Sequence, residues 1–198
     1  MKGFRLAWKK FTRDRLAFTG FVIIFVLVLA ALFAPVLAPY PEDTFQIHPA
    51  DRLEPPSAEH LLGTDSMGRD ILSRLLFGTR VTLVIAVIAV GASLLIGVPL
   101  GLVAGYFENL FSEGIMRVAD VFLSIPQVIL AIFLAQSFRP SIRSVILALS
   151  ITYWPWFTRI VYAETRALKK RAFLEATEAV GAGSIRTILL HVLPNVSS

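Results

Sequence analysis

Four stretches without a charged residue limit the folds that this chain can adopt. They cover residues 16–40, 81–107, 121–138 and 144–158. The first two contain 25 and 27 residues, whereas about 20 apolar residues suffice for a helix to cross the roughly 30 Å hydrocarbon core of a bilayer. Hydrophobic residues make up 56% of the whole chain, which is a larger fraction than in typical soluble domains. The sequence therefore predicts an all-α polytopic membrane protein.

The charged and proline-containing segments between these stretches predict how the chain is divided. Residues 1–15 form a basic amino-terminal segment, and residues 16–40 form the first transmembrane helix. Residues 41–78 form an acidic extracytoplasmic loop, in which Ser66–Phe77 has the pattern of a helix lying on the membrane surface. Residues 79–198 form the membrane-embedded core. Within this core we expect transmembrane helices at about 79–107, 115–138 and 143–163, and a cytoplasmic loop at 164–191.

The distribution of basic residues predicts the orientation of the chain. Six Lys or Arg residues lie within residues 1–15, and six more lie around the loop that follows the last apolar stretch. Because cytoplasmic flanks of transmembrane helices are enriched in Lys and Arg, we expect the amino terminus and residues 164–191 to lie in the cytoplasm. The same placement beside apolar stretches argues against a nucleic-acid-binding surface.

Three glycines in the second apolar stretch predict close packing between helices. Gly97, Gly101 and Gly105 recur every four residues and therefore share one face of a helix. Small residues on such a face allow another backbone to approach closely inside a bilayer. The alternative is that these glycines only reflect the general frequency of glycine in membrane helices.

The third apolar stretch contains a proline and lies next to a carboxylate. Pro126 predicts a kink in a transmembrane helix, with neighbouring helices satisfying the freed backbone groups. Asp120 lies near the inner end of this helix. An ion pair with Arg117, three residues earlier, is favoured over a role as a proton-relay carboxylate.

The chain lacks the sequence patterns of common catalytic and metal sites. It contains no cysteine, and its histidines, at positions 48, 60 and 191, are widely separated. No Walker A sequence, HExxH pair or Gly-x-Ser-x-Gly turn occurs in it. We therefore expect no catalytic residue, no cofactor, no metal site and no ATP hydrolysis by this chain itself.

Two polar blocks are the most distinctive motifs of the sequence. The first is Gly63-Thr64-Asp65-Ser66-Met67-Gly68-Arg69-Asp70, within the string HLLGTDSMGRDILSRLLFGTR. A glycine turn followed by a capped helix accounts for its residue types. The second is EATEAVGAGSIRTILLHVLP, residues 175–194. It combines a short amphipathic helix, a glycine-rich break and a second helical turn.

Both blocks resemble loops of one transporter family. The second resembles the EAA cytoplasmic loop of ABC importer permeases, with Thr177 in place of the second alanine and His191 in place of the isoleucine. Its matching positions are Glu175, Ala176, Gly181, Leu193 and Pro194. The first resembles the outer loop of dipeptide, oligopeptide and nickel permeases, at Gly63, Thr64, Asp65, Gly68, Arg69 and Asp70. The resemblance covers nearly all of residues 6–195 and is to the second-type inner membrane permease subunit of that importer family.

This resemblance implies a type I ABC importer permease fold, with four complete transmembrane helices and the start of a fifth. It implies a multi-pass subunit of the bacterial or archaeal cytoplasmic (inner) membrane, in contact with membrane lipid. The implied partners are a second permease subunit in a heterodimer, two ATP-binding subunits and an extracytoplasmic solute-binding protein. Because the family continues with further helices after Leu193-Pro194-Asn195, we expect the chain to be truncated at its carboxyl end.

The implied function is binding-protein-dependent transport of dipeptides or oligopeptides across the cytoplasmic membrane. Nickel or another small solute is the alternative within the family, and an ATP-independent secondary transporter is the alternative outside it. Under the favoured hypothesis, Glu175 contacts an ATPase subunit and Gly181 sets the angle between the two short helices of the cytoplasmic loop. The competing hypothesis for this loop is an amphipathic helix that rests on lipid headgroups.

Overall fold

The computed structural model describes residues 14–179 and 181–196. Within these residues the regular structure is helical, with one isolated β-bridge between Thr64 and Asp70. The chain divides into two compact units at Val84 and Ile85, and each unit is described by itself. Of the predicted amino-terminal segment 1–15, only Asp14 and Arg15 lie among the described residues.

The first unit begins with helix α2, Arg15–Leu37. Asp14 caps it, because its Oδ1 accepts hydrogen bonds from the backbone N–H groups of Leu16 and Ala17 at 3.0 and 3.2 Å. The helix ends before Pro39, since the residue preceding a proline is disfavoured in the helical conformation, and Ala38 is extended there. Two short 3₁₀ turns follow, η1 at Pro41–Thr44 and η2 at Pro49–Asp51.

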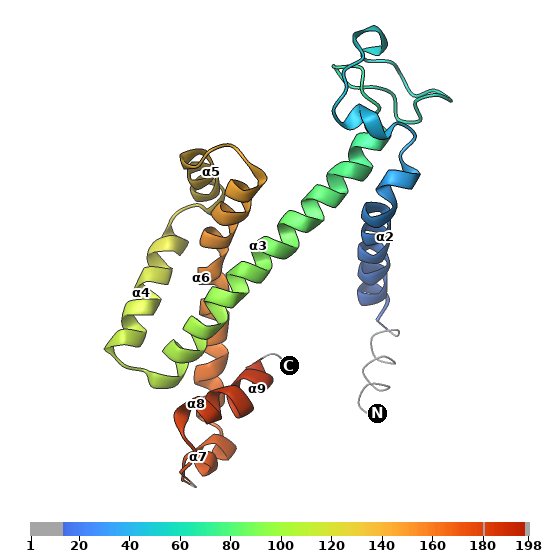
Figure 1. The fold of residues 1–198 in the computed structure, drawn as a ribbon. Coiled ribbons are helices and arrows are strands. Elements are labelled where there is room, and N and C mark those ends of the chain that lie inside the picture. The colour runs from blue at the N-terminus through green and yellow to red at the C-terminus, as the bar shows by residue number, and fades with distance from the viewer. Residues whose placement is uncertain (1–13, 180, 197–198) are drawn as a thin grey trace. The chain divides into compact units, whose positions relative to one another are not determined.

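Helix α3, Ile71–Phe107, is a single uninterrupted helix of 37 residues (Figure 1). The structure therefore differs from the separate surface helix expected at Ser66–Phe77. Residues 71–77 of the expected surface helix form the first turns of α3, and residues 66–70 belong to the preceding loop. Gly78 does not interrupt the helix, because propagating an existing helix gains one hydrogen bond for each added residue and outweighs the modest cost of one glycine.

Helices α4, Leu110–Ser124, and α5, Gln127–Ser137, replace the single kinked helix expected at 115–138. They are bent by 92° at the break between them, which Figure 1 shows beside α6, Ile142–Lys169. Pro126 causes more than a kink because Ile125, which precedes it, is extended. Both α4 and α5 pack against α6, so tertiary contact holds the two halves in different directions.

The second unit ends in four short elements. They are α7 at Ala172–Ala179, α8 at Ser184–Thr187, the π-helical turn η3 at Ile188–Val192, and α9 at Leu193–Val196. We refer to residues 172–196, without the undescribed residue 180, as the carboxyl-terminal segment. In Figure 1 it lies at one end of α3 and α6.

Among the described residues, three helices are long and apolar enough to cross a membrane: α2, α3 and α6. The bent pair α4 and α5 makes a fourth candidate if it counts as one span. The predicted all-α fold is confirmed for the described residues, and three to four of the helices are candidate membrane spans by length and composition. The assignment of four complete spans and the start of a fifth stays a prediction.

The three glycines of the predicted packing face lie directly against α6. A Cβ atom added to Gly97 or Gly101 would lie 2.6 or 2.7 Å from a backbone carbonyl oxygen of α6, and one added to Gly105 would lie 2.7 Å from Thr165 Cβ. The hydroxyl of Thr158 also donates to the carbonyl oxygen of Gly97 at 3.2 Å. The absence of side chains at these three positions is therefore what allows α3 and α6 to approach so closely.

Candidate functional site

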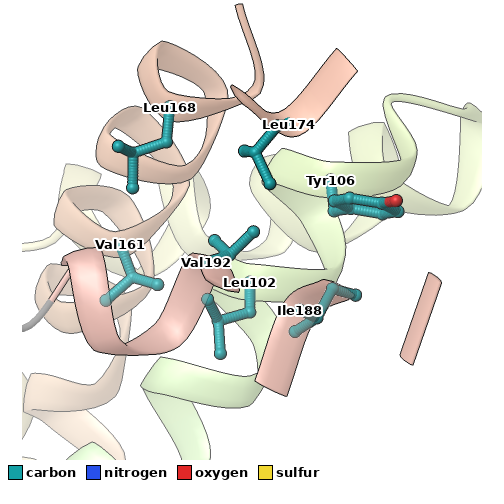
Figure 2. Packing of buried hydrophobic residues seen from close by; sticks show 7 residues of the cluster. All are labelled: Leu102, Tyr106, Val161, Leu168, Leu174, Ile188 and Val192. Atoms are coloured by element: carbon teal, nitrogen blue, oxygen red, sulfur yellow. The ribbon is translucent and has the colours of Figure 1, made fainter. Parts of the chain in front are cut away.

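The carboxyl-terminal segment is anchored on the ends of α3 and α6 by a buried apolar cluster. Figure 2 shows its members, which are Leu102, Tyr106, Val161, Leu168, Leu174, Ile188 and Val192. The first two belong to α3 and the next two to α6, while the last three come from the segment itself. Leu174 is only 1% exposed. Because burial of one such side chain contributes about 1.5–3 kcal/mol, the segment is held by its own apolar residues.

Basic side chains of α6 fix the end of α3 on which this segment rests. Lys169 Nζ donates to the carbonyl oxygen of Tyr106 at 2.7 Å and lies 5.5 Å from the centre of the Tyr106 ring. Arg166 Nε lies 3.2 Å from Glu108 Oε1. The last carbonyl groups of a helix have no partner within it and carry partial negative charge. Lys169 therefore satisfies an acceptor that α3 itself leaves open.

Gly181 forms the turn between α7 and α8. Its φ of +84° lies in the left-handed region, and the N–H of Ala182 donates back to the carbonyl oxygen of Thr177 at 3.3 Å. A Cβ atom at Gly181 would meet no described atom within 4 Å. Glycine is therefore required here for its backbone conformation and not for lack of space.

The other predicted residues of this loop are placed as follows. Glu175 and Ala176 lie within α7, and their side chains are outside the described part of the structure. The hydroxyl of Thr177 donates to the carbonyl oxygen of Phe173 at 2.8 Å. Leu193 packs against the buried cluster, and Pro194 lies in α9.

The surface of the carboxyl-terminal segment carries exposed apolar side chains. Ile185 is 73% exposed, and Phe173, Leu189 and Leu190 are also exposed. Exposed apolar side chains that recur on short helical elements fit a groove on another protein or a membrane interface. The segment thus has an apolar anchor on one side and exposed apolar residues on its surface.

The outer-loop motif, residues 63–70, closes a compact loop in the first unit. Gly63 and Gly68 have φ values of +74° and +77°. A Cβ atom at Gly68 would lie 1.7 Å from the carbonyl oxygen of His48, which no side chain could tolerate. Thr64 connects the motif to residues 51–54 of the same loop. Its hydroxyl donates to the carbonyl oxygen of Asp51 and accepts from the N–H of Glu54 at 2.8 Å.

Asp65 is the centre of a local hydrogen-bond network in this motif. Its carboxylate accepts from the backbone N–H groups of Met67 and Arg69 at 2.7 and 3.0 Å, and it pairs with the guanidinium groups of Arg69 and Arg74. Desolvation acts to raise the pKa of Asp65, but these hydrogen bonds and the Arg69 charge outweigh it and lower the pKa to about 2.

Asp70 connects the motif to the start of α3. Its Oδ2 accepts from the N–H of Ser73 at 2.7 Å, and its Oδ1 lies 3.1 Å from His60 Nδ1. Its own N–H donates to Asp43 Oδ2 at 3.0 Å. Burial acts to raise the pKa of Asp70, but the Ser73 and His60 hydrogen bonds lower it on balance. Asp70 therefore stabilises the first turn of α3 as a buried, charged cap.

Five acidic or histidine side chains of this loop, those of Asp43, His48, His60, Asp65 and Asp70, thus have partners within the first unit. Asp43 Oδ1, for example, lies 3.0 Å from His48 Nε2. No group of three or more potential ligands suited to a metal ion occurs within the described ranges. The geometry assigns the outer-loop motif to folding of the loop and to initiation of α3.

One charged pair of the second unit was not predicted from the sequence. Asp120 of α4 pairs with Arg159 of α6, and not with Arg117 as expected. The two residues of the pair are 39 positions apart in the chain, so local spacing could not reveal it. The uncharged stretch that ends at Thr158, just before Arg159, was the only available signal that this arginine lies close to the membrane.

Two family descriptions match different parts of the chain. Residues 97–198, slightly more than half of the chain, match the family described as binding-protein-dependent transport system inner membrane component. Residues 4–56 match the N-terminal TM domain of oligopeptide transport permease C. The first description names a membrane component of a transport system, as the sequence resemblance implied.

Curated relatives agree with these family matches. The chain is 37% identical over 191 residues to the dipeptide transport system permease protein of Alkalihalophilus pseudofirmus. This match covers 96% of this chain and 62% of the relative. It is 36% identical to the glutathione transport system permease protein of Pectobacterium atrosepticum, covering 96% of this chain and 64% of that relative. It is 34% identical to the oligopeptide transport system permease protein of Bacillus subtilis, and this match covers 95% of this chain and 62% of that relative.

The chain thus spans somewhat less than two thirds of the length of these relatives. The predicted likeness to a non-catalytic permease subunit of the dipeptide and oligopeptide type is confirmed by the two family matches together with the relatives. The chain belongs to the family of binding-protein-dependent transport system inner membrane components.

Proposed function

We propose that this chain is the membrane-spanning permease subunit of an ATP-driven importer that takes up short peptides. The observation that carries the proposal is the carboxyl-terminal segment. Leu174, Ile188 and Val192 anchor it on α3 and α6, while Ile185 and its exposed neighbours remain available to a partner. Such a segment can transmit a push from a bound subunit to two candidate membrane spans, because its anchors touch both helices.

In this proposal the segment docks on an ATP-binding subunit. Glu175 contacts that subunit, and Gly181 sets the angle between α7 and α8. The left-handed backbone of Gly181 supports this role, because a residue with a Cβ atom would disfavour the observed turn by about 1–2 kcal/mol. Closure of the ATP-binding subunits then moves the segment, and α3 and α6 move with it.

The assembly that follows is a heterodimer with a second permease subunit, two ATP-binding subunits and an extracytoplasmic solute-binding protein. The proposed topology is a type I importer fold, with α9 as the start of a fifth span and an amino terminus in the cytoplasm. The basic residues before α2 and around the end of α6 support this orientation. The cell would then be bacterial or archaeal, and the outer-loop motif would lie outside the cytoplasmic membrane.

Short peptides are the proposed substrates. The names of the relatives support this choice, since they are permease proteins of dipeptide, glutathione and oligopeptide transport systems. The direct measurement is uptake of labelled dipeptides, oligopeptides and nickel in cells that contain all subunits. Uptake of nickel without uptake of peptides would contradict the proposed substrate class.

The docking proposal is tested by placing a charge on the exposed surface of the segment. We expect Ile185→Glu to reduce copurification of the ATP-binding subunits in mild detergent by about tenfold or more, because a buried unpaired carboxylate at an interface costs several kcal/mol. Ile47→Glu is the matched control, since Ile47 is also exposed but lies in the outer loop. This control should leave copurification unchanged.

Two outcomes would contradict the docking proposal. One is that Ile185→Glu and Ile47→Glu retain the ATP-binding subunits equally well. The other is that the unmodified chain never copurifies with an ATP-binding subunit, which would favour an ATP-independent transporter.

A further inference from the structure

We propose that Lys169 is a positioning residue, which makes the end of α3 follow α6 when the carboxyl-terminal segment moves. Its ammonium group contacts both the backbone and the ring of Tyr106 on α3, and we call these two contacts the Lys169 clamp. The inference rests on the proposed coupling function of the segment and names the residue through which motion reaches the second helix. Two observations carry it, namely the place of Lys169 in the chain and the kind of contact that it makes.

Lys169 lies where α6 passes into the carboxyl-terminal segment. It is the last residue of α6, and α7 begins at Ala172. The short connection is a hydrogen-bonded turn, in which the N–H of Arg171 donates to the carbonyl oxygen of Leu168 at 2.9 Å. The chain itself therefore joins α6 to the segment, so a displacement of the segment acts on α6 directly.

Helix α3 has no such direct connection along the chain. It ends at Phe107, and α4, α5 and α6 follow before the segment begins. Leu102 and Tyr106 connect α3 to the segment through the buried apolar cluster (Figure 2). Hydrophobic contact is non-directional, so it holds these surfaces together without fixing their position along the helix axis. A directional bond between α6 and α3 fixes that position.

The Lys169 clamp supplies a directional bond. Lys169 Nζ donates to the carbonyl oxygen of Tyr106 at 2.7 Å, a distance typical of a hydrogen bond from a charged donor. The same nitrogen lies 5.5 Å from the centre of the Tyr106 ring, within the range of a cation–π interaction. Tyr106 is 5% exposed. One side chain at the end of α6 thus holds a buried residue of α3 that contributes to the support of the segment.

The clamp follows the point where the close packing of α3 on α6 ends. Gly105 packs against Thr165, but the buried hydroxyl of Thr165 has no hydrogen-bond partner among the described residues. Further up the same interface, the hydroxyl of Thr158 donates to the carbonyl oxygen of Gly97. Lys169, one turn beyond Thr165 on α6, therefore supplies a polar bond to α3 where Thr165 does not.

A neighbouring ion pair is less suited to this role. Arg166 Nε lies 3.2 Å from Glu108 Oε1, but the two side chains are 51% and 36% exposed. Exposed ion pairs between flexible side chains contribute little, because water screens the charges and ordering the side chains costs entropy. Lys169 is partly buried, and its acceptor is a backbone group of fixed position. The positioning role therefore belongs to Lys169 and not to Arg166.

Substitutions at two neighbouring lysines test the clamp. Lys169→Met removes the charge and the hydrogen-bond donors but keeps a long unbranched side chain. Lys170→Met is the matched control, because it removes the same charge at the next position, where the native side chain is exposed. Lys169→Arg restores a cation that can donate to a carbonyl oxygen and stack on a ring. Each variant is assembled with all subunits of the transporter in lipid vesicles.

Uptake of a labelled dipeptide and hydrolysis of ATP are measured on the same vesicles. We expect Lys169→Met to lower the uptake per ATP hydrolysed at least about fivefold, because it removes a hydrogen bond from a charged donor. Lys170→Met and Lys169→Arg should stay within about twofold of the native ratio. The ATP-binding subunits should remain bound to Lys169→Met, since the exposed apolar residues of the segment are unchanged.

Four results would overturn the positioning role. One is a native ratio of uptake to hydrolysis in Lys169→Met, and another is an equal loss in Lys170→Met. The third is a loss that Lys169→Arg does not restore. The fourth is a parallel fall of hydrolysis, uptake and copurification in Lys169→Met, which a defect of folding would cause.

Hydrogen exchange at the end of α3 separates this inference from the proposed function. The backbone amides of residues 103–107 should exchange at least about fivefold faster in Lys169→Met than in Lys170→Met, because the end of α3 opens locally without the clamp. This measurement requires neither nucleotide nor solute. Faster exchange in a chain that recruits no ATP-binding subunit would leave the clamp standing while the proposed function fails. Equal exchange in an active importer would overturn the clamp and leave the proposed function standing.

Discussion

The outer-loop motif and the carboxyl-terminal segment contain the two most distinctive motifs of the sequence, but their side chains are used in different ways. In the outer-loop motif, the carboxylates of Asp65 and Asp70 are bound within the loop itself. In the carboxyl-terminal segment, Leu174 is buried while Ile185 is largely exposed. One motif is satisfied by its own fold, and the other leaves apolar surface without a partner in the described chain.

This difference shows how a structural motif can be separated from a docking motif. A loop whose charged groups have partners at hydrogen-bond distance gains little from a further ligand, because binding would replace bonds that already exist. A short segment with exposed apolar side chains gains free energy when a partner covers them. The outer loop should therefore respond to substitutions by losing its fold, and the segment should respond by losing the ATP-binding subunit that we propose it binds.

The largest expected effect in the outer loop is that of Gly68→Ala. The added Cβ would overlap the carbonyl oxygen of His48, and φ is +77°, so we expect a loss of about 4 kcal/mol or more in loop stability. Limited proteolysis of the chain purified in detergent should detect the opened loop. Gly114→Ala is the control, because its Cβ would meet no described atom. Equal protease resistance of the two variants would contradict the rigid loop.

An intermediate effect is expected where α3 supports the carboxyl-terminal segment. In Gly101→Ala the new Cβ would lie 2.7 Å from Thr158 O and from Val161 Cβ. The overpacked helices should lose about 1–3 kcal/mol, measured as a lower midpoint of thermal unfolding in detergent. Gly91→Ala, on the same helix with no described atom within 4 Å, should gain up to about 1 kcal/mol. A higher midpoint for Gly101→Ala would show that α3 and α6 are not closely packed there.

The smallest expected effect is the acid sensitivity of the outer loop. The pKa of Asp65 is lowered from 3.8 to about 2 by folding. Its contribution to stability is therefore present above about pH 4 and is lost as the pH falls through about 2. We compare pepsin cleavage of the loop in the native chain and in Asp65→Asn. At pH 4 the loop of the native chain should be more stable than that of Asp65→Asn by about 1 kcal/mol, and pepsin should therefore cleave it more slowly. This difference in stability should shrink toward pH 2. A stability difference that stays the same between pH 4 and pH 2 would contradict the lowered pKa of Asp65.

Helix α2 shows what could be predicted from the sequence. The uncharged stretch 16–40 and the prolines at its end anticipate the observed helix Arg15–Leu37 closely. A long apolar stretch has one way to satisfy its backbone in a bilayer, so helix formation follows from composition and length alone. The resemblance of both motifs to peptide permeases was likewise available from local residues.

The arrangement of α4 and α5 against α6 shows what could not be predicted. Pro126 indicated a kink, but the bend of 92° depends on the packing of both α4 and α5 against α6. The pairing of Asp120 with Arg159 in place of Arg117 has the same origin, because side chains that meet across helices have no fixed sequence spacing. The continuation of α3 through Gly78 was missed because glycine marks a break only when no stronger interaction continues the helix.

The sequence by itself determined that this protein is helical, where its apolar helices lie, and which family its motifs resemble. These properties depend on local hydrophobicity and on residues that stand close together in the chain. Only the tertiary structure decided which helix faces meet, which charges pair, and which apolar side chains are buried or remain exposed. Those properties depend on contacts between distant residues, whose free energy is gained only when the helices pack together.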